Sequence, residues 1–330
     1  MPETLHIVAG DLGGTHCRTA VVAYDGETPH LLENTYASWR SKEERDLDVV
    51  LERGIGQTIR SFRGRIHGTI LAVAGTIPDH RTMREAANTA CLHDIVPYNI
   101  ADELARRFGV ESFAANDVEA ACAGEVAMGA LKGVKDAMFE NIGSGWGGAV
   151  VENGVTYAAE PGHTYLPGDG TRCGCGRTDC AETAVNIERR VRALHERGKI
   201  RIPDEHLKNP CAFSDRKAEW GTPWAVQLYT EIARIIGNVW GSRLNLRPHI
   251  THIGYQGSTL ECAMRIGFFC DEVKRAMRER SLFPEHADVP ILGVAAPRHP
   301  SEAPLGPLYG TASIWKRLHE ERRGNAETGQ

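Results

Sequence analysis

The 330-residue sequence has no apolar run long enough to cross a membrane, and its N-terminus has no segment resembling a secretory signal. An excess of basic charge is also missing, since 38 Lys and Arg residues stand against 43 Asp and Glu, giving a net charge of -5. A nucleic-acid partner therefore has no electrostatic support. We expect a soluble cytoplasmic protein that binds neither membranes nor nucleic acids.

The two most familiar nucleotide-binding motifs are absent as well. No Gly-Lys-Ser/Thr follows the first glycine-rich turn, as it does in a P-loop, and a strand follows that turn in place of the helix of a Rossmann fingerprint. The first strand is expected to start near residue 5, with no space ahead of it for a helix-turn-helix. The length and the ordinary share of hydrophobic residues, 42%, suit a globular protein of two domains.

Cysteine is sparse and unevenly placed, with nine residues in the chain. An odd number in a protein without a signal peptide argues against a disulfide framework. Some are scattered, mostly within apolar runs, and are expected to be reduced core residues: Cys17, Cys91, Cys122, Cys211, Cys262 and Cys270.

The remaining cysteines lie in one short segment, residues 160–182. Cys173, Cys175 and Cys180 follow His163 within this segment, in the pattern C-x-C-x4-C. One His and three Cys fill the tetrahedral shell that Zn²⁺ prefers, which predicts a structural zinc site without an open position. The alternative is a loop with ordinary buried or free cysteines.

Two strand-turn-strand patterns, residues 5–24 and 136–152, carry glycine-rich turns. Backbone N–H groups at Gly13, Gly14 and Thr15, and at Gly143, Ser144 and Gly145, are suited to approach phosphates. Asp11, just before the first turn, is a candidate Mg²⁺ ligand that would bind through water, in the manner typical of that ion. Two such hairpins suggest a duplicated fold with phosphates held between the halves, and the alternative for each is a plain hairpin turn.

Asn116 and Asp117 stand where a short strand from residue 111 meets a helix of small residues that extends to 131. Such residues favour helix N-caps. A carboxylate at the carboxyl end of a sheet strand is also where α/β proteins place ligands, so Asp117 is a candidate general base.

Further elements follow from hydrophobic spacing and from Gly and Pro. The expected strands are 30–39, 68–78, 249–254 and 289–293, the expected helices are 42–61, 99–109, 182–198 and 223–246, residues 200–222 are expected to be irregular, and the last ten residues to be frayed.

The segment E-x-G-H followed by C-x-C-G-x-x-x-C-x-E resembles the signature of the ROK family (repressor, open reading frame, kinase), and N-D-x-x-x-A-x-x-G-E from Asn116 resembles its catalytic segment. The resemblance implies an α/β, actin-like (ribonuclease H-like) duplicated fold with an interdomain cleft and a small zinc-binding loop. Its halves would be residues 1–116, onto which a closing helix at 303–320 packs back, and residues 117–302, which hold the zinc loop 160–182.

By this resemblance the protein is an ATP-dependent sugar kinase, glucokinase-like, that uses Mg²⁺ and carries zinc. Asp117 would be the base, the sugar would meet Asn88, Asn116, Asp117, Glu160, His163 and Glu182, and the nucleotide would meet the two glycine turns together with Gly254 and Gly257. The chain departs from the family pattern at Asp179, usually Gly, and at Trp146, a bulky residue that could cover the loop.

Other readings stay open at this point. N-acetylmannosamine, N-acetylglucosamine or fructose could replace glucose as the substrate. A sugar-responsive transcriptional regulator, or a sugar-binding protein without catalysis, is the alternative of another class, although Asp11, Thr15 and Asp117 are all present. Relatives suggest a homodimer or homotetramer.

Overall fold

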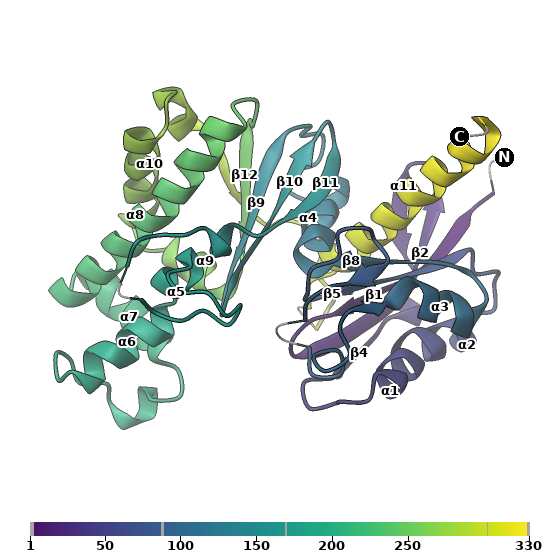
Figure 1. Cartoon of the computed structure of the whole chain (residues 1–330), viewed down its shortest axis with the longest axis horizontal. Coiled ribbons are helices and arrows are strands. Elements are labelled where there is room, and N and C mark those ends of the chain that lie inside the picture. The colour runs from purple at the N-terminus through teal and green to yellow at the C-terminus, as the bar shows by residue number, and fades with distance from the viewer. Residues whose placement is uncertain (1–2, 87–88, 169, 302, 329–330) are drawn as a thin grey trace. The chain divides into compact units, whose positions relative to one another are not determined.

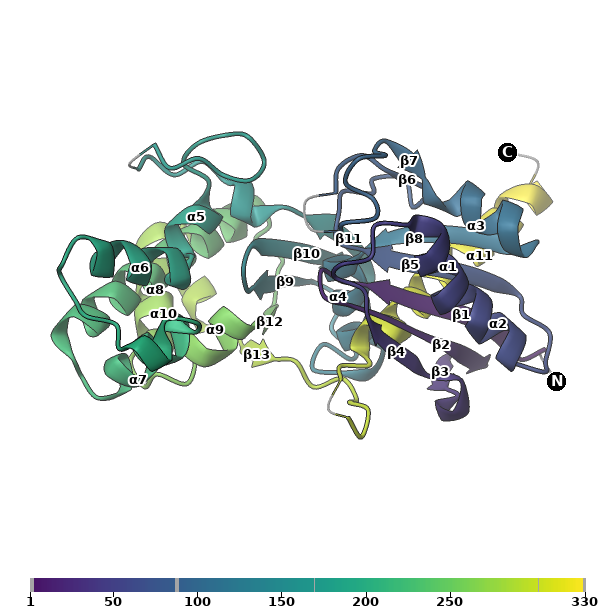
Figure 2. The ribbon, with the colours of Figure 1, turned by 90° about the horizontal axis from the view of Figure 1, so that it is seen from below.

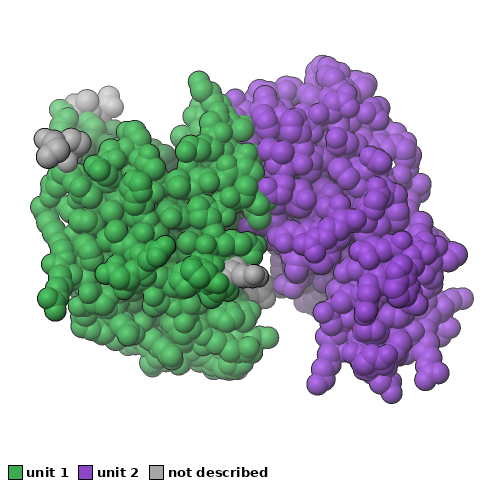
Figure 3. All heavy atoms as spheres, turned by 180° about the vertical axis from the view of Figure 1, so that it is seen from behind, with its two compact units in different colours: residues 1–135, 150–158, 294–330 green, residues 136–149, 159–293 purple. Residues whose placement is uncertain are grey.

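The computed structural model describes residues 3–86, 89–168, 170–301 and 303–328. It divides the chain into two compact units (Figure 3). Unit 1 holds residues 1–135, 150–158 and 294–330, and unit 2 holds 136–149 and 159–293. This division differs from the expected boundary at 116/117, because residues 117–135 group with the first unit. Among the described residues, no helix is long and apolar enough to cross a membrane.

The sheet of unit 1 has the strand order β3-β2-β1-β5-β8, with β4 also paired to β2. β1 pairs antiparallel with β2 and parallel with β5, and β5 is parallel to β8. The carboxyl ends of β1, β5 and β8 therefore lie at one edge of the sheet. The bounds are β1 Leu5–Leu12, β2 His16–Asp25, β3 Thr28–Leu31, β4 Ala37–Arg40, β5 Gly68–Val73 and β8 Glu111–Asn116.

Helices cover both faces of this sheet. In β1, Val8 faces the hydrophobic cluster that includes Leu51 and Leu104, while Ile7 faces the cluster that includes Trp315. Figures 1 and 2 show α1 to α3 on one side and α11 on the other. The elements are a 3₁₀ turn Glu33–Thr35, α1 Leu47–Leu51, a π-helical segment Glu52–Gly56, α2 Gln57–Ser61, β6 Thr82–Met83, β7 Tyr98–Asn99, α3 Ile100–Phe108, α4 Asp117–Met128 and α11 Gly306–Thr328.

α4 and α11 approach each other unusually closely through glycines. A Cβ added at Gly310 would lie 1.8 Å from the Ala120 carbonyl oxygen, and one at Gly124 would lie 2.0 Å from that of Gly306. Only glycine leaves room for the backbones at such distances. The last helix of the chain thus completes the core of the first unit.

The second sheet has the order β11-β10-β9-β12-β13, in which β12 is parallel to β9 and to β13. Residues 150–158, at the β10–β11 hairpin, group with unit 1. The strands are β9 Ala137–Ile142, β10 Trp146–Glu152, β11 Val155–Ala159, β12 His252–Gln256 and β13 Ile291–Gly293. The helices are α5 Ala181–Val185, α6 Ile187–Glu196, α7 Pro210–Glu219, α8 Pro223–Leu246, α9 Ser258–Ala263 and α10 Phe269–Arg280, with 3₁₀ turns at Pro161–His163, Asp204–His206 and Pro284–Asp288.

The order β3-β2-β1-β5-β8 in the first sheet corresponds strand by strand to β11-β10-β9-β12-β13 in the second. This repetition confirms the expected α/β, actin-like and duplicated fold class. Several local expectations were wrong. The expected strand 30–39 is interrupted by a 3₁₀ turn, and the region 200–222 contains α7, which Asn209 caps by accepting from the Ala212 N–H. The last turns are helical to Thr328 and not frayed.

Candidate functional site

The predicted metal ligands converge. The ligand atoms of His163, Cys173, Cys175 and Cys180 all lie within 4.8 Å of one another. Cys175 Sγ and Cys180 Sγ are 3.7 Å apart, and Cys173 Sγ is 3.8 Å from His163 Nδ1. Thiolates that bind one tetrahedral zinc through bonds of about 2.3 Å are about 3.8 Å apart. The donor set and its spacing therefore fit a closed, structural zinc site.

Backbone hydrogen bonds fold the segment 160–182, called the metal loop below, into a tight turn. The Cys173 N–H donates to the Arg177 carbonyl, and the Gly176 N–H donates to the Cys173 carbonyl. Asp179 has a φ of +57°, the left-handed conformation that glycine adopts most easily. Its Oδ1 accepts from the Gly170 N–H at 2.9 Å. This departure from the family pattern is therefore accommodated, because a short polar side chain tolerates the conformation and bonds locally.

Three of the predicted sugar ligands lie on this segment: His163 belongs to the cluster, Glu182 contacts it, and Glu160 precedes it in the sequence. Glu182 Oε1 accepts from the Cys173 thiol at 2.7 Å and lies 3.7 Å from His163 Nδ1. Its Oε2 accepts from the Trp146 backbone N–H at 3.2 Å. Glu160 is exposed and precedes the 3₁₀ turn that carries His163. Unit 2 thus brings carboxylates and an imidazole together on one short segment.

The second glycine-rich turn, Gly143–Gly145, is held by its neighbours. Thr259 Oγ1 donates to the Gly143 carbonyl at 2.9 Å, and Asn186 Nδ2 donates to the Ser144 carbonyl at 3.1 Å. The effect of Trp146 on access to this loop was left open by the sequence, and in the structure its side chain is 1% exposed and lies in the core. Its indole N–H donates to Glu140 Oε2 at 2.6 Å.

Asp11, at the end of β1, is buried, and Arg18 Nη1 donates to its Oδ2 at 2.8 Å. Burial raises the pKa of Asp11, and the Arg18 guanidinium opposes the rise. Arg18 was not among the predicted site residues, although its pairing opposite Asp11 in the β1–β2 ladder follows from the hairpin register. The turn Gly13–Thr15 follows, with Gly14 and Thr15 exposed.

Asp117 is half-buried in the first turn of α4, directly after β8. Burial, and next the negative charge of Asp11, raise its pKa to about 6. The N-cap is Asn116, whose Oδ1 accepts from the N–H groups of Val118 and Glu119 and whose Nδ2 donates to the Gly75 carbonyl at 2.9 Å. The cap residue is thus a different residue from the candidate base.

The other predicted contacts vary in position. Gly257 follows β12 at a φ of +100°, where a Cβ would lie 2.4 Å from the Ile142 carbonyl oxygen, so a side chain is excluded there. Gly254 is buried within β12, between Phe139 and Leu292. Asn88 lies outside the described residues. Cys17, Cys91 and Cys122 are buried as expected, but the cysteines at 211, 262 and 270 are half-buried.

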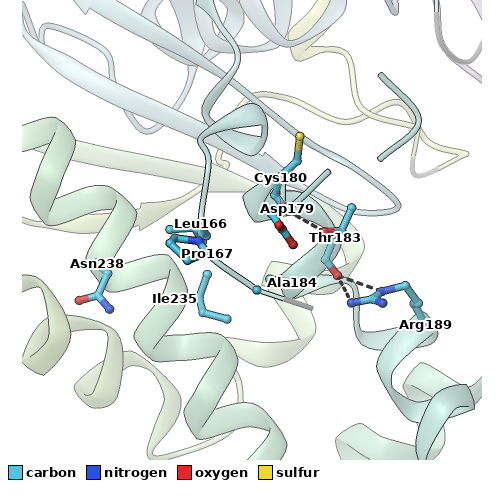
Figure 4. Close-up of a pocket in the computed structure, with 10 residues that line it drawn as sticks. Leu166, Pro167, Asp179, Cys180, Thr183, Ala184, Arg189, Ile235 and Asn238 are labelled. Carbon is cyan, nitrogen blue, oxygen red and sulfur yellow. Dashed lines mark hydrogen bonds between the residues drawn. The ribbon is translucent and has the colours of Figure 1, made fainter. Parts of the chain in front are cut away.

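A small pocket of about 230 Å³ lies behind the metal loop (Figure 4). Asp179 and Cys180 from the loop, Arg189 from α6 and Ile235 from α8 are among its lining residues. Arg189 is already engaged, since it donates to the Thr183 carbonyl and to Thr171 Oγ1. The predicted sugar ligands Glu160, His163 and Glu182 do not line this pocket.

Repeated strand order and paired glycine turns define an actin-like α/β protein, and one of its loops carries a Cys₃His cluster that could hold a metal ion. The chain belongs to the ROK family, whose model matches residues 7–251. It is 29% identical over 205 residues to a glucokinase of Thermotoga maritima, covering 59% of this chain and 62% of that protein. It is also 29% identical to an N-acetylmannosamine kinase of Shigella flexneri, covering 54% and 61%. The matches thus span about three-fifths of these relatives.

Solved structures have the same fold. A ROK hexokinase from Thermus thermophilus superposes with a TM-score of 0.73 at 21% identity, covering 96% of this chain and all of that one. A ROK glucokinase from Streptomyces griseus, in complex with glucose and AMPPNP, gives 0.67 at 22%, covering 94% and 98%. A ROK transcriptional regulator, a homologue of the E. coli MLC protein, gives 0.71 at 21%, covering 93% and 78%. These structural similarities establish the fold. The activity has to be inferred from the residues of the site.

Proposed function

We propose that this protein is an ATP-dependent hexose kinase that converts glucose to glucose 6-phosphate. The observation that carries the proposal is Asp117, a half-buried carboxylate after β8 whose pKa is raised to about 6. A base whose pKa lies slightly below neutral pH is mostly ionised there and still accepts a proton effectively. Asp117 would accept the proton of the attacking O6 hydroxyl.

The sugar would be held by Glu160, His163 and Glu182 of the metal loop, with Asn116 and Asn88. Carboxylates and imidazole are suited to the many hydroxyls of a hexose, and a rigid loop reduces the ordering cost of binding. His163 Nδ1 faces the cluster, so its other ring nitrogen would serve a sugar hydroxyl.

Zinc, when bound by His163, Cys173, Cys175 and Cys180, would have no open position and would contribute loop stability, not Lewis-acid chemistry. Asp11 would hold hydrated Mg²⁺, which neutralises phosphate charge. Backbone N–H groups of the turns Gly13–Thr15 and Gly143–Gly145 would bind the ATP phosphates, and Gly257 with Gly254 would border the adenosine.

The reaction would then need few chemical groups. The sugar O6 attacks the γ-phosphorus of ATP, its proton passes to Asp117, and ADP leaves with the bond between γ-phosphorus and its bridging oxygen broken. Phosphoryl transfer depends mainly on positioning and charge stabilisation, which the turns and one base supply.

Asp117→Asn tests this assignment directly. The amide keeps the shape of the side chain but cannot accept the proton, so kcat should fall about 10²–10⁴-fold. Glucose affinity, measured by calorimetry, should change little. ADP release near the wild-type rate, in a coupled assay with glucose, would show that Asp117 is not the base.

The sugar itself is best identified with a panel. The relatives include kinases of glucose and of N-acetylmannosamine at equal identity, so both sugars should be compared with N-acetylglucosamine and fructose in one ADP assay. A higher kcat/KM for an N-acetyl sugar would replace glucose in the proposal.

A transcriptional regulator is the second candidate, because one shares the fold at a TM-score of 0.71. The net charge of -5 does not favour DNA binding. A specific mobility shift of DNA, together with no ADP release from any sugar, would favour it. We further propose a homodimer or homotetramer in the cytoplasm, which sedimentation and fractionation would test.

A further inference from the structure

Glu140 is unusual because it is a carboxylate in the middle of a central strand, β9, with 0% of its surface exposed. Its Oε1 is paired with the guanidinium of Arg243 from α8, 103 positions along the chain. Its Oε2 accepts the indole N–H of Trp146 at 2.6 Å. Both oxygens therefore have a partner, as a buried carboxylate requires.

Such a buried pair is a poor source of stability. Removing two charges from water costs several kcal/mol per ion, and apolar residues of similar volume often serve stability as well or better. The pair instead fixes the orientation of the Trp146 ring, because the charged Glu140 carboxylate holds the indole N–H in one place. Trp146 is also 1% exposed, so its ring has little freedom to move.

Trp146 directly follows Gly145, the last residue of the glycine turn. Its indole N–H donates to Glu140 Oε2, and its backbone N–H donates to Glu182 Oε2 at 3.2 Å. The turn closes on itself through the Gly143 N–H and the Gly145 carbonyl at 3.0 Å. A shift of Trp146 would therefore displace the backbone of residues 143–145.

We propose that Trp146, anchored by the buried Glu140–Arg243 pair, is a positioning residue that sets the glycine turn 143–145 for the nucleotide phosphates. The inference rests on the proposed function, which assigns that turn to phosphates. Trp146 itself touches no substrate and acts through the backbone.

Trp146→Phe tests the idea because it removes the indole N–H and keeps an aromatic ring. The Kd of Mg–AMPPNP, measured by calorimetry, should rise about tenfold, as expected for one lost hydrogen bond to a charged group. The KM for ATP should rise with it, while kcat and the KM for the sugar stay within about twofold of the wild type.

Trp315→Phe is the matched control. Trp315 is also fully buried, and its indole N–H donates to the Glu111 carbonyl at 3.1 Å, but it belongs to unit 1. Its loss should lower the melting temperature without changing the Kd of Mg–AMPPNP. Equal effects of the two variants on this Kd would reduce Trp146 to a structural role and overturn the proposal.

Glu140→Gln provides a second test if Trp146→Phe does not fold, read on folded protein because the change leaves Arg243 without its anionic partner. The amide oxygen still accepts from the indole but carries no charge, so the Kd of Mg–AMPPNP should rise about threefold. An unchanged Kd would overturn the proposal. A wild-type protein that neither binds Mg–AMPPNP nor releases ADP would instead refute the proposed function.

Discussion

Asp11 and Asp117 are two carboxylates of unit 1 whose environments differ. Arg18 donates to Asp11, which compensates part of its burial, whereas the described hydrogen bonds of Asp117 come from the backbone. Burial and the neighbouring charge of Asp11 hold the pKa of Asp117 at about 6. The structure therefore separates a carboxylate paired with an arginine, Asp11, from one whose pKa lies close to neutral pH, Asp117.

A pH profile should report this separation. Asp117 must be ionised to accept a proton, so kcat/KM should rise with pH through a limb near 6 and level off above it. Asp11→Asn removes the like charge, so it should shift the limb to lower pH whatever its effect on the maximum rate.

The zinc content has to be measured at each pH, because protonation of the ligands releases metal. A kcat/KM that stays flat from pH 5 to 7 with zinc retained would contradict the assignment of Asp117.

At the scale of elements, the contact of α4 with α11 is the tightest feature of unit 1. Gly124 and Gly310 let the backbones meet where any Cβ would overlap a carbonyl oxygen. Backbone atoms cannot move aside as a flexible side chain does, so these positions should tolerate no substitution. Asp117 begins α4, which links this packing to the position of the candidate base.

Gly310→Ala should accordingly lower the free energy of unfolding by about 1–3 kcal/mol or more through overpacking. Gly324→Ala lies in the same helix, where a Cβ meets nothing within 4 Å, and should raise it by about 0.5–1 kcal/mol. Urea unfolding of both variants measures the difference. Equal, small effects would mean that the helices are not packed this closely.

Local patterns predicted much of this. The expected helix 99–109 and the cluster of four candidate metal ligands follow from residues near one another in sequence. In the structure Asn99 caps that helix, Gly109 ends it, and the four ligand atoms lie together. The pairing of Glu140 with Arg243 joins positions far apart, and only the packing of α8 on β9 brings them together. The place of the Trp146 side chain could not be predicted for the same reason, because its partner Glu140 is identified only once β9 lies in the buried sheet.

Across the whole molecule, each unit has its own sheet, and the four candidate metal ligands all belong to unit 2. The metal loop is joined to the second glycine turn through Glu182, whose two oxygens contact Cys173 and Trp146. Loss of a bound metal should therefore destabilise the metal loop and the second glycine turn, and leave unit 1 unchanged.

Chelation of zinc should lower the melting temperature by at least about 5 °C, because a structural metal contributes folding energy. Hydrogen exchange should increase in residues 160–186 and 143–147, and stay unchanged in 5–25 and 306–320. Added zinc should reverse the change. Equal deprotection of both units, or none, would exclude this role for the cluster.

The packing of α11 on the first sheet also has a consequence for biosynthesis. A ribosome completes β1 early, yet the apolar face that Ile7 and Phe113 present is covered by Leu308 and Trp315, which are synthesised much later. Until then that face lacks its natural cover and is open to chaperones or to self-association. Premature termination shortly before codon 306 should therefore yield an insoluble product instead of a smaller working enzyme.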